Sequence, residues 1–237
     1  VDTILVVRVC PGLCGDRFST CRCCLRFARV RSMAPHCSEG FEASDTPAAY
    51  TRFSIVDVML NVSIIIPAWN EAERIRDCLL NATRQTIMPH EVLVVDNRST
   101  DNTCAVVEQF IAEHPEAPVK LLHQNDEQGL IPTRNFGLNA ATGDVLGRFD
   151  ADCMIRPDWV EVVSGIFTED PAAMGATGPV MYYDMPSRHF GLKGDNSLRK
   201  RIYRADGGQP LLFGSNMALR ASAWHQIANE VCEIRPM

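Results

Sequence analysis

Short apolar runs alternate with amphipathic stretches from residue 61 onward. The runs 61–66 and 91–95 are rich in β-branched residues, which is typical of strands buried on both faces of a sheet. The runs 119–122 and 144–149 predict two further strands. Four strands are therefore expected in the body of the chain.

Three helices are expected between these strands. Asn70 and Glu73 form a capping-box pair, and apolar residues recur at helical spacing after them. Residues 99–101, with the sequence Ser-Thr-Asp, are expected to cap a second helix. A third helix is predicted over about residues 130–141, closed by Gly143 in the position after a helix that favours glycine.

Strands and helices that alternate at this spacing predict βαβ units. The expected fold class is therefore α/β, with a Rossmann-like, mostly parallel sheet flanked by helices. Ligands of such sheets bind beyond the carboxyl ends of the strands. The loops in which to look for function are therefore 67–71, 96–101 and 150–153.

The composition fits one soluble globular domain. The chain has 237 residues, of which 46% are hydrophobic and 22% are charged, and it is too short for two full enzyme domains. No apolar run approaches the roughly 18 residues that span a bilayer, so no transmembrane segment is expected. The formal net charge is −6, which argues against nucleic acid as a partner because nucleic-acid-binding surfaces are usually basic. An anionic ligand would need a local device such as a metal ion.

Residues 1–58 differ from the rest of the chain and show no periodic pattern. Six of the ten cysteines lie here: Cys10, Cys14, Cys21, Cys23, Cys24 and Cys37. Their spacing lacks the paired C-x2-C knuckles of a zinc site, and the first apolar run is too short for a signal peptide. We interpret this segment as an irregular, disordered arm ahead of a domain at 59–237. Alternatively, it is not natural coding sequence, and the protein begins at Met33 or Met59.

The remaining cysteines are scattered singly through the domain: Cys78, Cys104, Cys153 and Cys232. Such a distribution is typical of reduced thiols in a cytoplasmic protein. The expected location is therefore the cytoplasm, either free or peripheral at the inner face of the membrane.

Several common phosphate-binding and hydrolase motifs are missing from the sequence. No G-x-G-x-x-G follows the first strand, no G-x-x-x-x-G-K-[ST] occurs, and no G-x-S-x-G is present. These absences exclude most dinucleotide enzymes, P-loop NTPases and serine hydrolases with a nucleophile elbow.

Acidic residues follow two of the predicted strands. Asp96 ends the second run, and Asp150 and Asp152 follow the fourth. Residues i and i+2 of an extended segment point the same way, so Asp150 and Asp152 could share Mg²⁺ or Mn²⁺ that neutralises a diphosphate. Alternatively, they are solvated loop carboxylates, and Asn70 and Glu71 are only an N-cap and a first-turn acid.

Four blocks in order carry a resemblance over about residues 60–225. They read VSIIIPAWNEAERIRDCL, VLVVDNRSTDNT, GLIPTRNFGLNAATGDVLGRFDADC and FGSNMALRASAW. Together they resemble the family 2 glycosyltransferases of the GT-A fold. The resemblance implies transfer of a sugar, with inversion and with Mn²⁺ or Mg²⁺, from a UDP- or GDP-linked donor to a hydroxyl of a sugar or lipid-linked acceptor. It also implies a role in making cell-surface polysaccharide or glycolipid.

The resemblance also assigns roles to individual residues. Nucleotide binding falls to Pro67, Ala68, Asn70, Glu71, Asp96, Arg134 and Asp150, with Asp96 receiving the base. Asp152, together with Asp150, would bind the metal. Gly214, Ser215 and Asn216 would shape the sugar and acceptor side, or would alternatively be a loop that turns into a helix.

Two departures from the family pattern matter. Asn97-Arg98 stands where the family often has Asp-Gly. The family's catalytic base, an acidic pair beyond the fourth block, has no clear counterpart before Met237, so the general base is unknown and Glu233 is the remaining candidate. The chain is therefore expected to be truncated at its C-terminus.

Two alternatives remain for the function. The chain is a catalytically inactive fragment or nucleotide-sugar-binding module that lacks its base, or it is a sugar nucleotidyltransferase. The second alternative would require a Gly-rich, basic loop after the first strand, and residues 67–71 contain neither Gly nor Lys or Arg.

Overall fold

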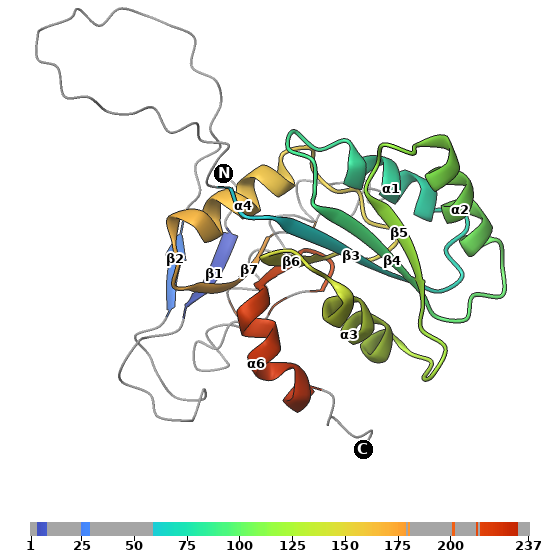
Figure 1. The fold of residues 1–237 in the computed structure, drawn as a ribbon. Helices are drawn as coiled ribbons and strands as arrows, with labels where there is room; N and C mark the ends of the chain where they lie inside the picture. The colour runs from blue at the N-terminus through green and yellow to red at the C-terminus, as the bar shows by residue number, and fades with distance from the viewer. Residues whose placement is uncertain are drawn as a thin grey trace, which may run out of the picture.

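The computed structural model describes residues 4–8, 25–28, 59–178, 180, 201, 212 and 214–231. The strands in these ranges are β1 (Ile4–Arg8), β2 (Leu25–Ala28), β3 (Val62–Ala68), β4 (Glu91–Asp96), β5 (Val119–His123), β6 (Val145–Arg148), β7 (Ala173–Thr177) and β8 (Met217–Arg220). The helices are α1 (Ile75–Thr83), α2 (Thr103–Glu113), α3 (Leu130–Ala140), α4 (Trp159–Glu169) and α6 (Ala221–Val231). The strands form one sheet, in the order β2-β1-β7-β8-β6-β3-β4-β5 (Figure 1).

The part of the sheet that carries the predicted site is parallel. β3 lies between β4 and β6 and runs parallel to both, and β5 runs parallel to β4. β8 is antiparallel to β6 and joins it to β7. The four predicted strands and the three predicted helices are all present, which confirms the α/β fold with a mostly parallel core. The carboxyl ends of β3, β4 and β6 therefore meet at one edge.

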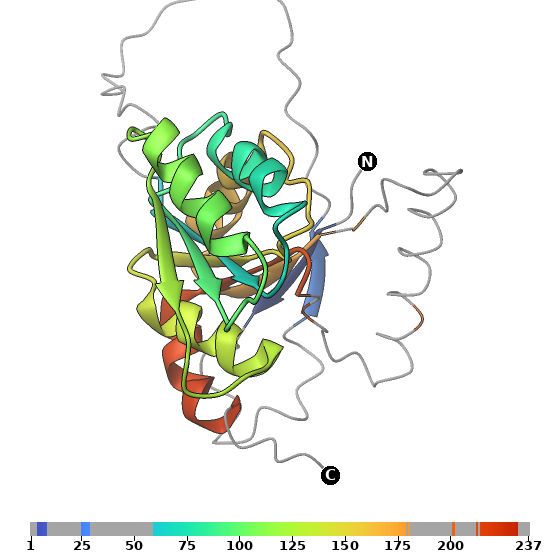
Figure 2. The same cartoon turned by 90° about the vertical axis from the view of Figure 1, so that its right-hand side faces the viewer.

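Helices cover both faces of the sheet (Figures 1 and 2). Helices α1, α2 and α4 pack on one face around Leu79, Phe110 and Phe167, and α3 and α6 pack on the other around Leu138 and Trp224. The two helices of the second face are linked, because the indole N–H of Trp224 donates to Asn139 Oδ1 at 2.8 Å. None of the helices in the described ranges has the length and apolar character that crossing a bilayer requires.

The first core strand extends further than the sequence predicts. The apolar run stops at Pro67, but β3 continues to Ala68, which is in register with Asp96 of β4. The backbone carbonyl of Ile65 points towards the β6 side, since it accepts from the Phe149 N–H. The backbone groups of residue 67 point to the same side, because the direction alternates along a strand. Pairing with β6 has ended by then, so a proline without an N–H is tolerated there.

Two predicted helix boundaries are wrong. Helix α1 begins at Ile75, and its cap residue Arg74 makes no side-chain capping bond, so Asn70 and Glu73 do not form a capping box. Among the described residues, the glycine with a positive φ is Gly129. Gly143 therefore does not adopt the left-handed conformation expected after a helix. Gly143 is needed for space instead, since a Cβ there would come within 2.8 Å of the Asn61 carbonyl oxygen.

The sequence predicts no regular element in residues 1–58, but the structure has two strands there. β1 pairs antiparallel with β7, and β2 pairs antiparallel with β1. Pairing with a distant strand can impose a strand on a segment whose local pattern does not predict one, and here it extends the sheet beyond β7. The other residues of 1–58 lie outside the described part, so the irregular arm stays a prediction for them.

A buried carboxylate ties three elements together at the edge of the sheet opposite the predicted site. Glu91 Oε1 accepts from Ser63 Oγ (2.8 Å), Thr142 N (2.7 Å) and Thr142 Oγ1 (2.8 Å), and Oε2 accepts from Lys120 Nζ (3.1 Å). Burial alone would raise the pKa of Glu91, but these hydrogen bonds outweigh it and lower the pKa to about 2. Glu91 is therefore ionised in the folded protein at neutral pH.

Glu91→Gln is expected to lower the free energy of unfolding at pH 7 by about 2 kcal/mol, because hydrogen bonds to a charged group are lost. The pKa of this carboxyl is lower in the folded state than in the unfolded state, so its contribution is present above the ordinary pKa of 4.5 and is lost as the pH falls towards about 2. Urea unfolding at several pH values measures both effects. The exposed Glu108→Gln is the control, and an equal loss in both variants would contradict the prediction.

Candidate functional site

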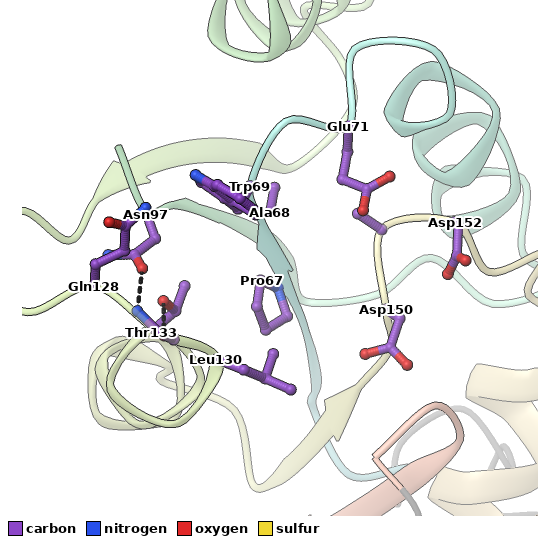
Figure 3. A pocket seen from close by; sticks show the side chains of 12 residues that line it. Pro67, Ala68, Trp69, Glu71, Asn97, Gln128, Leu130, Thr133, Asp150 and Asp152 are labelled. Carbon is purple, nitrogen blue, oxygen red and sulfur yellow. Dashed lines mark hydrogen bonds between the residues drawn. The ribbon is translucent and has the colours of Figure 1, made fainter. Parts of the chain in front are cut away.

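A cavity of about 640 Å³ opens at the carboxyl edge of the parallel strands (Figure 3). It is lined by Pro67, Ala68, Trp69, Glu71, Asn97, Gln128, Gly129, Leu130, Thr133, Asp150, Ala151 and Asp152. These residues come from the end of β3, the residue after β4, the start of α3 and the segment after β6. The cavity thus lies where a parallel sheet is expected to bind its ligand.

Three carboxylates form one side of the cavity. Figure 3 shows Glu71, Asp150 and Asp152 on the same side of the β3 end. Burial raises the pKa of Glu71, and the negative charge of Asp152 raises it further. The negative charges of Asp101 and Asp150 act in the same direction, and the positive charge of Arg74 offsets part of the effect. Carboxylate oxygens are the donors that Mg²⁺ and Mn²⁺ prefer, so Asp150 and Asp152 fit a divalent metal.

A buried arginine lies behind Asp150. Arg148, the last residue of β6, forms an ion pair with Asp150 Oδ1; the arginine side chain is 7% exposed and the Asp150 side chain is 41% exposed. Arg148 Nε has no hydrogen-bond partner in the described part of the chain. A Cβ on Gly214 would collide with Arg148 Nη1. Gly214 therefore leaves the space in which Arg148 reaches Asp150.

The opposite side of the cavity is built on Asn97, which follows β4. The buried Asn97 amide donates to the carbonyls of Gln124 (2.7 Å) and Glu127 (3.0 Å) and accepts from Gly129 N (2.7 Å). Gly129 has φ +143° and leads into α3, whose positive N-terminal end lies beside the cavity. Trp69 is 55% exposed on this side. This wall thus offers an aromatic face, amides and a helix end to a ligand.

Asn70 shapes the site without lining the cavity. Its backbone is left-handed, with φ +55°, and its Oδ1 accepts from Thr100 N (2.8 Å) and Asp101 N (3.3 Å). The Glu71 N–H donates to Thr103 Oγ1 at 2.8 Å. These bonds join the loop after β3 to the loop after β4, and so hold Glu71 at the cavity. The nucleotide contact expected of Asn70 stays a prediction.

Asp96 is buried and does not line the cavity. The residue is 3% exposed, Oδ2 accepts from Ser99 N at 3.3 Å, and Oδ1 has no hydrogen-bond partner among the described residues. The following Arg98 has φ +60°, a region that favours glycine, at the position where the family often has one. A base-holding role for Asp96 therefore stays a prediction that would have to use a buried carboxylate oxygen.

The other predicted site residues lie outside the cavity wall. Arg134, on α3, donates to Asn135 Oδ1. Asn216 Oδ1 accepts from Trp159 Nε1 at 3.0 Å, and the Ser215 carbonyl accepts from the Cys153 thiol at 3.6 Å. Residues 214–216 lead into β8, and α6 follows directly after this strand, so the alternative of a loop before a helix stays open. Glu233 lies outside the described residues.

Sequence reasoning missed several positions in or beside the cavity. Trp69 and Leu130 stand in the quoted blocks but were not singled out, although Leu130 opens a predicted helix at the ligand edge. Gln128 and Thr133 flank the same helix start, where cavity-lining residues are to be expected. Arg148 has no sequence signal, because inside an apolar run it is indistinguishable from an outward-facing strand residue.

The chain is similar to known glycosyltransferases. A family model described as glycosyl transferase family 2 matches residues 63–226. Glycosyltransferase AglE of Haloferax volcanii is 34% identical over 128 residues, which cover 53% of this chain and 41% of AglE. Chondroitin synthase of Escherichia coli is 34% identical over 109 residues, which cover 46% of this chain and 16% of the synthase. The matched part thus spans less than half of either relative.

A solved structure has the same fold. It is a mannosyltransferase from Pyrobaculum calidifontis in complex with GDP-Man and Mn²⁺, and it superposes with a TM-score of 0.54 at 24% sequence identity. The match covers 71% of this chain and 47% of the mannosyltransferase. The likeness confirms the fold predicted from the sequence.

Proposed function

Because the chain belongs to glycosyltransferase family 2, we propose that it transfers a sugar from a nucleoside-diphosphate donor to an acceptor hydroxyl, with inversion and with a divalent metal. The acceptor is a sugar or lipid-linked hydroxyl, in synthesis of cell-surface polysaccharide or glycolipid. The observation that carries the proposal is the cavity at the carboxyl edge, with three carboxylates on one side and an aromatic and amide wall on the other.

The two sides of the cavity divide the work. Asp150 and Asp152 would hold Mn²⁺ or Mg²⁺, which neutralises the charge that develops on a leaving nucleoside diphosphate. Arg148 holds Asp150 in position from below through their ion pair. Pro67 and Ala68 form the floor for the nucleoside, and the unpartnered Oδ1 of Asp96 would accept an N–H of the base after a small movement.

The negative charge of the cavity-lining carboxylates also explains why a nucleotide would need a metal ion to bind. A diphosphate brought next to Glu71, Asp150 and Asp152 without a cation would meet only like charge on that side. Burial and the charge of Asp152 already raise the pKa of Glu71, so a further negative charge beside this residue would be unfavourable. The metal is thus expected to precede or accompany the nucleotide.

A thermal-shift panel tests the proposal on the full chain. UDP, GDP and their common sugar conjugates are each added with and without Mn²⁺. A ligand at about 100 times its dissociation constant adds about 2.7 kcal/mol, which is a shift of a few degrees for a domain of this size. The expected result is a shift with one nucleotide that requires the metal.

Two outcomes of this panel would contradict the proposal in different ways. A cooperative transition that no nucleotide moves would remove donor binding altogether. A metal-dependent shift would favour the alternative of a nucleotide-sugar-binding module if a separate assay detects no sugar transfer to any acceptor. That assay measures release of the nucleoside diphosphate.

A further inference from the structure

A second group of possible metal ligands lies away from Asp150 and Asp152. Asp96, Cys104 and His123 each offer one ligand atom, and these atoms lie within 4.8 Å of one another. Asp96 and His123 are the last residues of β4 and β5 and are register partners. Cys104 is in the first turn of α2, which follows β4 in the chain. Three different elements of the fold therefore direct an oxygen, a sulfur and a nitrogen ligand to one place.

The ligand atoms of this group differ from those of Glu71, Asp150 and Asp152, which offer only carboxylate oxygens. A thiolate, an imidazole and one carboxylate suit Zn²⁺, whereas Mg²⁺ and Mn²⁺ prefer oxygen ligands alone. Zinc ligands lie about 2.0–2.3 Å from the metal, which places them about 3.5 Å apart in a tetrahedron. His123 Nδ1 is already 3.8 Å from Asp96 Oδ2. Small side-chain rotations of Cys104 and His123 would close the remaining gaps.

Asp96 is a buried ligand of this group, and Oδ2 is the carboxylate oxygen nearer to His123. Asp96 Oδ1 is shielded from solvent and has no hydrogen-bond partner among the described residues, which is costly for a charged oxygen. The His123 side chain is 49% exposed, so an ion can reach the group from solvent. Cys104 is a free thiol, and burial together with the negative charge of Asp96 raises its pKa to about 11. Metal binding would release the thiol proton to solvent.

We propose that Asp96, Cys104 and His123 form a zinc site, with water as the fourth ligand. Because the proposed function assigns Asp96 to the nucleotide base, zinc at this site would compete with the donor, and that consequence rests on the proposed function. The chain would then hold two metal sites of opposite effect: an oxygen site that supports nucleotide binding and a mixed-ligand site that opposes it.

Cobalt(II) is the probe for the site, because tetrahedral Co²⁺ has visible bands and a thiolate ligand adds a charge-transfer band. The full chain is compared with Cys104→Ser and His123→Gln, so that cobalt bound by other cysteines cancels in the difference. Each variant is expected to lose the Co²⁺ bands of this site. Each should also bind one zinc ion, the one held at this site in wild type, more than about tenfold more weakly by equilibrium dialysis. Cys153→Ser and His225→Gln are the matched controls.

The outcomes separate the zinc site from the proposed function. Equal metal binding by wild type, Cys104→Ser and His123→Gln would overturn the zinc site; His123 is exposed, so its variant keeps the test valid if Cys104→Ser unfolds. Zinc that binds in wild type but leaves the UDP or GDP thermal shift unchanged would overturn the competition. Failure of every nucleotide to bind would remove the proposed function, while the cobalt difference would still report the site.

Discussion

Asp152→Asn is expected to abolish the metal-dependent part of nucleotide binding and to leave the fold intact. The Asp152 side chain is exposed at the cavity, so its substitution removes no buried contact. An amide keeps the shape of the carboxylate but loses the charge that a divalent cation requires. Metal ligation of a diphosphate is worth several kcal/mol, so nucleotide affinity in Mn²⁺ should fall by about 100-fold or more.

Isothermal titration with and without Mn²⁺ measures this effect, and thermal unfolding of the ligand-free chain checks the fold. The ligand-free chain should be as stable as wild type or slightly more stable, because the charge of Asp152 no longer raises the pKa of Glu71. Asp158→Asn is the matched control, since Asp158 lies nearby in the chain and pairs with Arg156 outside the cavity. An unchanged Mn²⁺ dependence in Asp152→Asn would remove Asp152 from the metal site.

The sequence predicts the core of this fold because burial on both faces leaves a direct signal. The runs 61–66 and 91–95 are apolar at eight of their eleven positions, and residues 62–66 and 91–95 all become buried in central strands. Their parallel pairing follows from the helices between them, and it brings Glu71, Asp150 and Asp152 to one edge. Chain order and burial thus suffice to place these three carboxylates.

The rest of the site depends on contacts between distant segments, which leave no periodic signal. Asn70 looks like a helix cap in the sequence, but its side chain binds residues 100 and 101 on the loop after the neighbouring strand. Asn97 gives no sign that it holds the segment before α3. The pairing of β1 with β7 joins residues more than 160 positions apart. Local pattern cannot report such pairings.

Gly214→Ala is expected to lower both the stability of the domain and its affinity for Mn²⁺. Gly214 does not have a positive φ, so alanine fits the backbone, and the effect is one of space alone. The new Cβ would collide with Arg148 Nη1 and displace the guanidinium from Asp150. A buried charge that loses its partner costs about 3–5 kcal/mol, and relaxation of the flexible arginine should reduce this to about 2–4 kcal/mol.

The matched control for this variant is Gly165→Ala in α4. A Cβ at Gly165 would meet nothing within 4 Å, so the same chemical change there should be neutral or stabilise the helix by up to about 1 kcal/mol. Urea unfolding gives the stability, and Mn²⁺ titration reports whether Asp150 has lost its orientation. Equal stability of Gly214→Ala and wild type would show that Arg148 moves away freely.

A double-mutant cycle with Arg148→Met then identifies the cause of the loss. If the collision with Arg148 is responsible, Gly214→Ala should cost at least about 1 kcal/mol less in the Arg148→Met background than in wild type. The Asp150 side chain is 41% exposed, so it can be hydrated when its partner is gone, and the Met variant should remain folded. Additive losses would mean that Gly214 acts independently of Arg148. A large coupling, together with weaker Mn²⁺ binding in both single variants, would establish that the 214–216 turn acts on the metal carboxylate through this arginine rather than by touching the sugar.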